Sequence, residues 1–181
     1  MPQRHWCKLP LLIMLTGAVT MGALAGGEAA GLRVNATASM PRGLWLVRAG
    51  APLRRGEIVA ICPPDRADIR EAAGRGYIPA GRCPGGYEPL IKPVAAVGGD
   101  IVTVTPAGIF VNGKPVANTR PLASDDAGRA LHSFPAGTYR LSRGELWLLA
   151  GRDPRSFDSR YFGAVPLANI IGAARPLWVR Q

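Results

Sequence analysis

Glycine and proline are spread along the whole chain, and this distribution restricts the fold more than any other feature of the sequence. The 181 residues include 23 glycines and 17 prolines, which follow no repeating period. Glycine permits tight turns between strands, whereas proline interrupts helices and central strands. A collagen-like or disordered chain is not indicated, because there is no period and 48% of the residues are hydrophobic. The sequence therefore predicts a turn-rich β domain with a hydrophobic core.

Short apolar or alternating segments between the turns predict one strand after another, with little helix. Asn112-Gly113 predicts a type I′ hairpin turn. Residues 138–141 and 145–149 are expected to pair with each other across Ser142-Arg143-Gly144. We expect a mainly β fold, a coiled and mostly antiparallel sheet preceded by an N-terminal hydrophobic helix. The expected strands are residues 44–47, 57–61, 90–97, 101–104, 108–111, 138–141, 145–149, 170–174 and 177–179. The last two of these are expected to close the sheet.

The N-terminal segment, residues 1–30, is expected to direct the domain at residues 31–181 out of the cytoplasm. Arg4 and Lys8 precede an apolar run from Leu9 to Ala25, and positive charge before such a run keeps the N-terminus in the cytoplasm. The run is at the short end for a membrane-spanning helix. An uncleaved anchor, which we favour, and a cleavable signal peptide both remain open. The first places the domain on the periplasmic side of a Gram-negative inner membrane, and the second releases it into the periplasm.

The balance of charges favours contact with a membrane surface. The formal net charge is +10, which attracts anionic lipid or nucleic acid. The arginines are scattered and form no dense basic block. We therefore expect the inner membrane as a partner and no specific nucleic acid.

Two of the three cysteines lie in the exported part of the chain, where disulfides persist. Cys62 and Cys83 are predicted to pair with each other. A zinc site is the alternative, but two cysteines without a nearby histidine are poor ligands. No metal or organic cofactor is indicated.

The segment between the two cysteines is expected to be an insertion that braces one side of the site. Pro63-Pro64-Asp65 predicts the start of a short helix with Asp65 as its N-cap, and Gly74 is placed to end it. Residues 76–86 are rich in glycine and proline, so a loop is expected there.

Ser39 and Lys92 are the candidate catalytic residues. Ser39 precedes Met40-Pro41 at the start of a strand. Lys92 lies in an apolar strand, where burial favours the neutral amine, and a neutral amine near a serine hydroxyl is a general base. A histidine-based triad is less compatible with the sequence, because His5 is expected on the cytoplasmic side and His132 lies in a polar loop. The polar segment at 151–163 could supply supporting hydrogen bonds.

Three segments, in this order, resemble the type I signal peptidases, the Ser–Lys proteases of membranes. Ser39-Met40-Pro41 resembles their nucleophile box, residues 92–100 their lysine box, and residues 158–163 their Asp-Ser-Arg-Tyr-aromatic-Gly box. The closer resemblance is to the TraF-type branch, which serves conjugative plasmid transfer. It is carried by Asn35-x-Thr37-x-Ser39-Met40-Pro41-x-Gly43, by the small size and by the Cys-Pro-Pro segment. The resemblance runs from about Val34 to Trp178, and it departs from the wider family where Asp153-Pro154-Arg155 replaces an Asn-Arg-Asp-Asn run.

The resemblance implies a role for each of several side chains. Ser39 would attack the peptide carbonyl, and Lys92 would accept its proton. The Thr37 hydroxyl would join the Ser39 backbone N–H in stabilising the oxyanion, although an ordinary strand threonine is equally compatible with the residues alone. Ser156 would orient the lysine. Asp158 and Arg160 would form a supporting ion pair.

The resemblance also implies a substrate, a pilin precursor or another exported protein matured for a conjugative secretion system. In that branch the acyl-enzyme can be captured by the N-terminal amine of the pilin, which gives a cyclic product. Three alternatives stay open at this point. They are a general type I signal peptidase, a self-cleaving Ser–Lys repressor and a non-catalytic periplasmic scaffold of the conjugation machinery. The repressor would need a DNA-binding segment where this chain has its apolar run.

Overall fold

The computed structural model describes residues 13–14, 26–50 and 53–180 of a chain that divides into two compact units, residues 1–33 and 34–181. In the first unit, residues 26–29 are helical. Within the described ranges, no helix has both the length and the apolar character needed to cross a membrane. The predicted N-terminal hydrophobic helix lies outside these ranges, except for Ile13 and Met14, which are helical.

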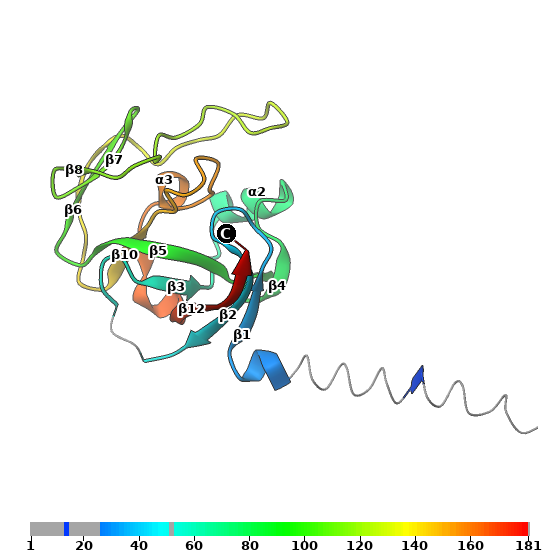
Figure 1. Ribbon diagram of the computed structural model, residues 1–181. Coiled ribbons are helices and arrows are strands. Elements are labelled where there is room, and N and C mark those ends of the chain that lie inside the picture. The colour runs from blue at the N-terminus through cyan, green and yellow to red at the C-terminus, as the bar shows by residue number, and fades with distance from the viewer. Residues whose placement is uncertain (1–12, 15–25, 51–52, 181) are drawn as a thin grey trace, which may run out of the picture. The chain divides into compact units, whose positions relative to one another are not determined.

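The described strands form two sheets, and every pairing with a described register is antiparallel (Figure 1). The mainly β, mostly antiparallel fold predicted from the sequence is confirmed. The seven-stranded sheet has the order β1 (Leu32–Asn35), β2 (Arg42–Arg48), β12 (Ile170–Arg180), β3 (Ile58–Ile61), β5 (Leu90–Val97), β10 (Glu145–Leu148) and β11 (Val165–Pro166). The four-stranded sheet has the order β8 (Lys114–Pro115), β7 (Gly108–Val111), β6 (Ile101–Thr105) and β9 (Gly137–Arg140).

Three apolar clusters make up the core of the second unit. The first packs β3, β5 and β10 with the helices α2 (Ala67–Gly74) and α3 (Ser159–Phe162). The second joins the four-stranded sheet to β5 and β10. The third lies on β2, β3, β5 and β12 and includes Met40. Because β5 contributes to all three clusters, its side chains are positioned by the whole domain.

The predicted pairing of residues 138–141 with 145–149 is wrong, because these segments belong to different sheets. β9 pairs with β6, and β10 pairs with β5 and β11. Burial explains the difference: β9 alternates between half-buried and exposed residues, as an edge strand does, whereas Leu146, Trp147 and Leu148 are all buried. A strand that is buried on both faces needs an internal position in a covered sheet.

The C-terminal strand also differs from the prediction, since it does not close the sheet. Residues 170–180 form the single strand β12, which lies between β2 and β3. A register shift between Pro176 and Trp178 accommodates the proline, which cannot donate to a regular ladder.

Gly43 lies within β2, at a position where only glycine fits. Its φ is +139°, and an added Cβ would lie 2.2 Å from the carbonyl oxygen of Trp178 on β12. Glycine at this position therefore permits the close approach of two backbones.

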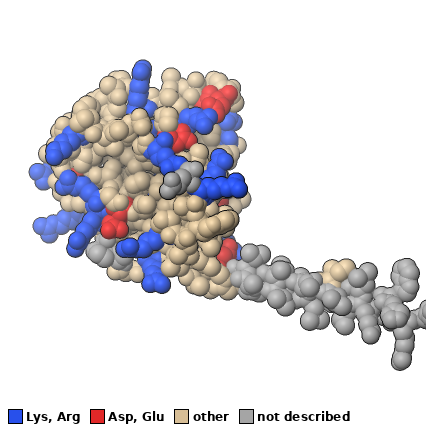
Figure 2. Space-filling model, in the orientation of Figure 1, with Lys and Arg blue, Asp and Glu red and all other residues tan. Residues whose placement is uncertain are grey.

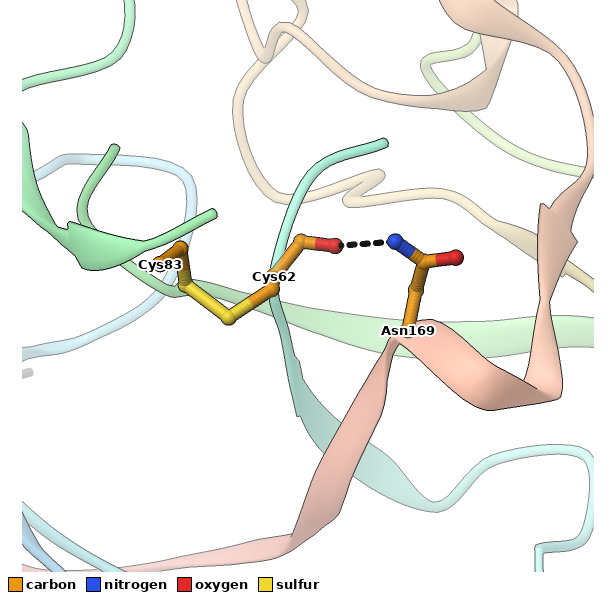
Figure 3. Close-up of a disulfide and its surroundings, with 3 residues drawn as sticks. All are labelled: Cys62, Cys83 and Asn169. Atoms are coloured by element: carbon orange, nitrogen blue, oxygen red, sulfur yellow. Dashed lines mark hydrogen bonds between the residues drawn. A yellow bond between two sulfur atoms is a disulfide. The ribbon is translucent and has the colours of Figure 1, made fainter. Parts of the chain in front are cut away.

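The insertion between the cysteines is closed by a disulfide between Cys62 and Cys83, the pairing predicted from the sequence. Figure 3 shows that Asn169 also holds Cys62, because its side-chain amide donates to the Cys62 carbonyl over 3.0 Å. The Cys62 backbone N–H donates to the Asn169 carbonyl over 2.8 Å. The start of the insertion is thus fixed to the residue that precedes β12 as well as to Cys83.

Two details of the insertion correct the prediction. Helix α2 starts after Arg66 and has no side-chain cap, so Asp65 is not its N-cap. The Asp65 carboxylate instead accepts hydrogen bonds from Arg70 and Tyr87. The expected loop also contains a strand, β4 (Ala80–Cys83), which two bridges, one at Ala80 and one at Cys83, connect to Tyr87.

Candidate active site

Ser39 lies in the loop between β1 and β2, at residues 36–41. Ser39 is only 6% exposed, and its Oγ is 3.0 Å from Oγ1 of Thr37. Met40 is buried in the cluster that contains Trp45, and the indole N–H of Trp45 donates to the Pro41 carbonyl over 3.0 Å. The position of Ser39 is therefore fixed by the packing of Met40, which follows it, and by the hydrogen bond to Thr37, which precedes it.

Asn35, at the end of β1, is the centre of the hydrogen bonds in this loop. It is buried, and its Nδ2 lies 3.1, 3.0 and 3.2 Å from the carbonyl oxygens of Thr37, Met40 and Pro41. Its Oδ1 accepts from Thr37 Oγ1 over 2.8 Å and from the Thr37 backbone N–H over 3.3 Å. Sequence reasoning identified Asn35 only as part of a motif, although an amide four residues before the serine is the signal that could have found this network.

Lys92 lies on β5, an internal strand of the seven-stranded sheet, opposite Val59 of β3. Leu90 and Val94, two residues on either side, belong to the apolar cluster beneath α2, so Lys92 shares that face. The residue is 4% exposed, and Nζ donates to Ser156 Oγ over 2.8 Å.

Burial lowers the pKa of the Lys92 amine from 10.5 to about 8. The negative charge of Asp158 opposes this shift, whereas the positive charge of Arg160 adds to it. A pKa near 8 leaves roughly a tenth of the amine neutral at pH 7, which is enough for a general base.

Ser156 is held in a polar turn that follows β10. The residue is buried, and its backbone N–H donates to the Asp153 carbonyl over 3.0 Å. The Asp153 side chain accepts from the Arg155 backbone N–H over 2.9 Å. Asp153 and Arg155 thus shape the turn that presents Ser156 to Lys92.

Asp158 and Arg160 form an ion pair with no exposed surface. Nε of Arg160 is 2.8 Å from Asp158 Oδ1, and Nη2 is 3.0 Å from Oδ2. Asp158 also caps helix α3 and accepts from the Ala150 backbone N–H over 2.9 Å. The remaining Arg160 donors reach the carbonyls of Asn118, Pro154 and Ala150. Every contact is structural, so this pair acts on Lys92 through its charges and through the loop it holds.

The predicted site residues therefore form three groups: Ser39 with Thr37, Lys92 with Ser156, and Asp158 with Arg160. Ser39 and Lys92, both within the described ranges, are not hydrogen-bonded to each other. Their chain neighbours Met40 and Ile91 belong to the same apolar cluster, so the serine loop and the lysine strand pack in one region of the core.

A pocket lies between α2 and the loop around residue 131, and Phe157 and Tyr161 also line it. None of Ser39, Thr37 and Lys92 lines it. His132, which the sequence placed in a polar loop, is exposed and lines this pocket.

This chain belongs to the signal peptidase family, peptidase S26, whose family model matches residues 3–179. The resemblance found in the three sequence boxes is thereby confirmed. The chain is similar to a plasmid transfer protein TraF of Escherichia coli, 38% identical over 165 residues that cover 91% of this chain and 92% of that protein. It is 40% identical to a conjugal transfer protein TraF of Agrobacterium fabrum over 167 residues, 92% of this chain and 90% of that one.

More distant similarities are to signal peptidase I proteins. The chain is 27% identical to a signal peptidase I of Leptolyngbya laminosa over 123 residues, 68% of this chain and 51% of that protein. A solved signal peptidase I from Enterococcus faecalis covers 70% of this chain and 98% of its own, with 19% identity and a TM-score of 0.39.

Proposed function

We propose that the protein is a Ser–Lys serine endopeptidase that processes exported precursor proteins at the membrane. The observation that carries this proposal is the buried Lys92, whose pKa is about 8 and whose Nζ is bound by Ser156. Burying an ionisable amine in the core lowers the stability of the fold. Buried groups with a strongly shifted pKa are typical of active sites. Membership of a peptidase family supports the same reaction class.

In the proposed reaction, Ser39 Oγ attacks the carbonyl carbon of the scissile peptide while neutral Lys92 accepts the hydroxyl proton. The new C–O bond moves the carbonyl electron pair onto oxygen, and the Ser39 backbone N–H and the Thr37 hydroxyl stabilise the resulting oxyanion. When the C–N bond breaks, the Lys92 ammonium returns its proton to the leaving nitrogen. Water, deprotonated by Lys92, then hydrolyses the acyl-enzyme.

The supporting residues are assigned roles that follow from their contacts. Ser156 orients the lysine amine, because it is the hydrogen-bond partner of Nζ. Asp158 and Arg160 hold the Ser156 segment and tune the Lys92 pKa in opposite directions.

We further propose that the substrate is a pilin precursor of a conjugative transfer system. Two relatives that cover nine-tenths of this chain are named as plasmid or conjugal transfer proteins. The acyl-enzyme can react with the N-terminal amine of the same pilin instead of with water. That reaction forms a peptide bond, releases Ser39 and gives a cyclic product one water lighter than the hydrolysed chain.

The proposed location is the periplasmic side of the inner membrane, beside the conjugative secretion machinery. Leu177 and Trp178 on β12 are 53% and 77% exposed, and tryptophan favours the membrane interface. Lysine and arginine side chains are distributed over the visible face of the molecule in Figure 2, with few acidic ones. A net charge of +10 adds an attraction to anionic lipid.

The test is the intact mass of a candidate pilin precursor co-expressed with the native protein, with Ser39→Ala or with Lys92→Met. We expect a shortened product only with the native protein, and a further loss of one water if the product is cyclic. A precursor with an ordinary signal peptide, tested in parallel, separates a general signal peptidase from a pilin-specific one. An uncut precursor in all three strains, together with no labelling of Ser39 by an acylating probe, would favour the scaffold alternative.

A further inference from the structure

We infer that Asn35 is a positioning residue for the candidate nucleophile, because its carboxamide sets the direction of the hydrogen bonds that run through Thr37 to Ser39. The inference deepens the proposed peptidase function and rests on it. Three observations lead to it: the partners of the amide, the hydrogens available on the two hydroxyls, and the burial of Asn35.

The partners of the amide determine which way it faces. Asn35 Nδ2 lies within 3.2 Å of three backbone carbonyls, those of Thr37, Met40 and Pro41, and these groups can only accept. Oδ1 faces the Thr37 backbone N–H, which can only donate. A reversed amide would put an acceptor against three acceptors and a donor against a donor, so the orientation is unambiguous.

The direction of the hydroxyl bonds follows from this orientation. Asn35 Oδ1 carries no hydrogen, so Thr37 Oγ1, 2.8 Å away, must use its single hydrogen to donate to it. Ser39 Oγ is 3.0 Å from Thr37 Oγ1, and Thr37 has no further hydrogen to give. Ser39 therefore donates to Thr37, and the bonds run from Ser39 through Thr37 to Asn35.

This arrangement defines a resting state of the site. The Ser39 proton points toward Thr37 rather than toward Lys92, and the Thr37 hydrogen is not directed at an oxyanion. Attack on a substrate requires the Ser39 hydroxyl to turn toward Lys92. The Thr37 O–H must then rotate from Asn35 to the oxyanion, while its oxygen stays in place.

Asn35 keeps those oxygens in place because it binds the loop on both sides of the serine. Its N–H groups reach the carbonyls of Met40 and Pro41 after Ser39, and its oxygen holds Thr37 before it. Hydroxyl rotation is a small motion, whereas displacement of a reacting oxygen by about 1 Å can cost about 100-fold in rate. The residue thus acts through Thr37 and the loop, without touching the substrate.

The kinetic test measures Ser39 labelling by a fluorophosphonate, followed by intact mass, in the full chain. Asn35→Ala is expected to lower the first-order labelling constant about 10- to 100-fold, with little change in the probe concentration at half-saturation. In a Thr37→Val background, the same change is expected to lower the constant by a smaller factor than in the native background, because the part of the effect that passes through Thr37 is already lost. Asn169→Ala, which removes another backbone-binding amide, is the matched control and is expected to label at the native rate.

Equal labelling of Asn35→Ala and native protein would overturn the inference, and so would the full loss in the Thr37→Val background. Thermal unfolding of each variant separates misfolding from a site effect. Neutron diffraction supplies a readout that does not depend on activity, with deuterium expected between Thr37 Oγ1 and Asn35 Oδ1. Deuterium on Thr37 directed at Ser39 would contradict the inference, whereas native protein that fails to label would contradict the proposed function alone.

Discussion

Lys92 is the residue whose chemistry agrees least with its surroundings. Its pKa of about 8 in the folded chain lies below the unfolded value of 10.5, so the unfolded chain binds more protons between these two pH values. Stability therefore rises with pH across this window, and the cost of burying the lysine is greatest below pH 8.

We expect Lys92→Met to increase the free energy of unfolding at pH 7 by about 1–3 kcal/mol, since methionine keeps the apolar stem without the amine. The gain should shrink as the pH is raised from 8 toward 10.5. Denaturant unfolding at pH 7 and pH 10 measures both effects. Lys114→Met, at an exposed lysine of β8, is the control and should change stability little at either pH. A Lys92→Met protein less stable than the native one would show that burial of the amine does not destabilise the fold.

Asp158 is predicted to set the pH at which the lysine becomes a base. Its charge is the strongest influence that raises the Lys92 pKa. Asp158→Asn should therefore move the midpoint of the pH–rate profile for Ser39 labelling below that of the native protein. Asp153→Asn, a weaker influence in the same direction, should move it less. A midpoint that stays or rises in Asp158→Asn would show that the ion pair does not act on the lysine electrostatically.

At the scale of the elements, the contact between β2 and β12 depends on a single glycine. Gly43→Ala would place a Cβ 2.2 Å from the Trp178 carbonyl, at a φ of +139°. We expect it to lower the free energy of unfolding by about 2–4 kcal/mol. Gly108 has a similar φ, of +146°, but the atom nearest to its Cβ position, Oγ1 of Thr119, is 3.4 Å away, so Gly108→Ala isolates the cost of the backbone angle. Equal losses in both variants would contradict the close-contact explanation.

The disulfide is a second feature that stabilises the contacts between elements, because it closes the insertion that carries α2. Its two cysteines are 21 residues apart, a loop for which the chain-entropy relation gives about 3 kcal/mol. A Cys62→Ser/Cys83→Ser protein should lose about that much stability in denaturant unfolding. Native protein unfolded in a reductant should have the same free energy of unfolding as this double variant. A double variant as stable as the oxidised protein would show that the Asn169 hydrogen bonds suffice to hold the insertion.

Sequence patterns predict those elements that local interactions decide. Asn112 and Gly113 both have positive φ values, 49° and 76°, because a two-residue hairpin turn needs them whatever surrounds it. The strand around Lys92 is equally predictable from its apolar neighbours. The sheet partner of residues 145–149 is not, since it depends on burial by β5 and β11, which pair with β10 through contacts that no local pattern encodes.

The same distinction between locally determined features and features that depend on distant contacts applies to the site. The residue types at positions 39 and 92, with their immediate neighbours, are sufficient to indicate a serine nucleophile and a lysine base. The contact between Lys92 and Ser156 spans 64 residues, so its prediction depended on family resemblance and not on spacing. The amide of Asn35, four residues before the serine, is visible in the sequence, but its network was missed because the backbone carbonyls that it binds are placed by the fold.

At the scale of the whole molecule, we expect Trp178 to contact the membrane. Vesicles of brominated phosphatidylglycerol should quench part of the tryptophan fluorescence of the full chain, and Trp178→Phe should remove part of that quenching. Trp147→Phe, at a buried tryptophan, is the control and should leave the absolute decrease in fluorescence on vesicle binding unchanged. Undiminished quenching in Trp178→Phe would place the membrane-facing surface elsewhere on the protein.

The most direct test of the central claim, that Lys92 activates Ser39, is the rate of Ser39 acylation as a function of pH, with the modified residue located by peptide mass. The native protein should carry the label on Ser39, at a rate that rises about tenfold per pH unit and levels off above the Lys92 pKa of about 8. Lys92→Met should label very slowly at every pH. A label on another residue, or native-like rates in Lys92→Met, would contradict the account.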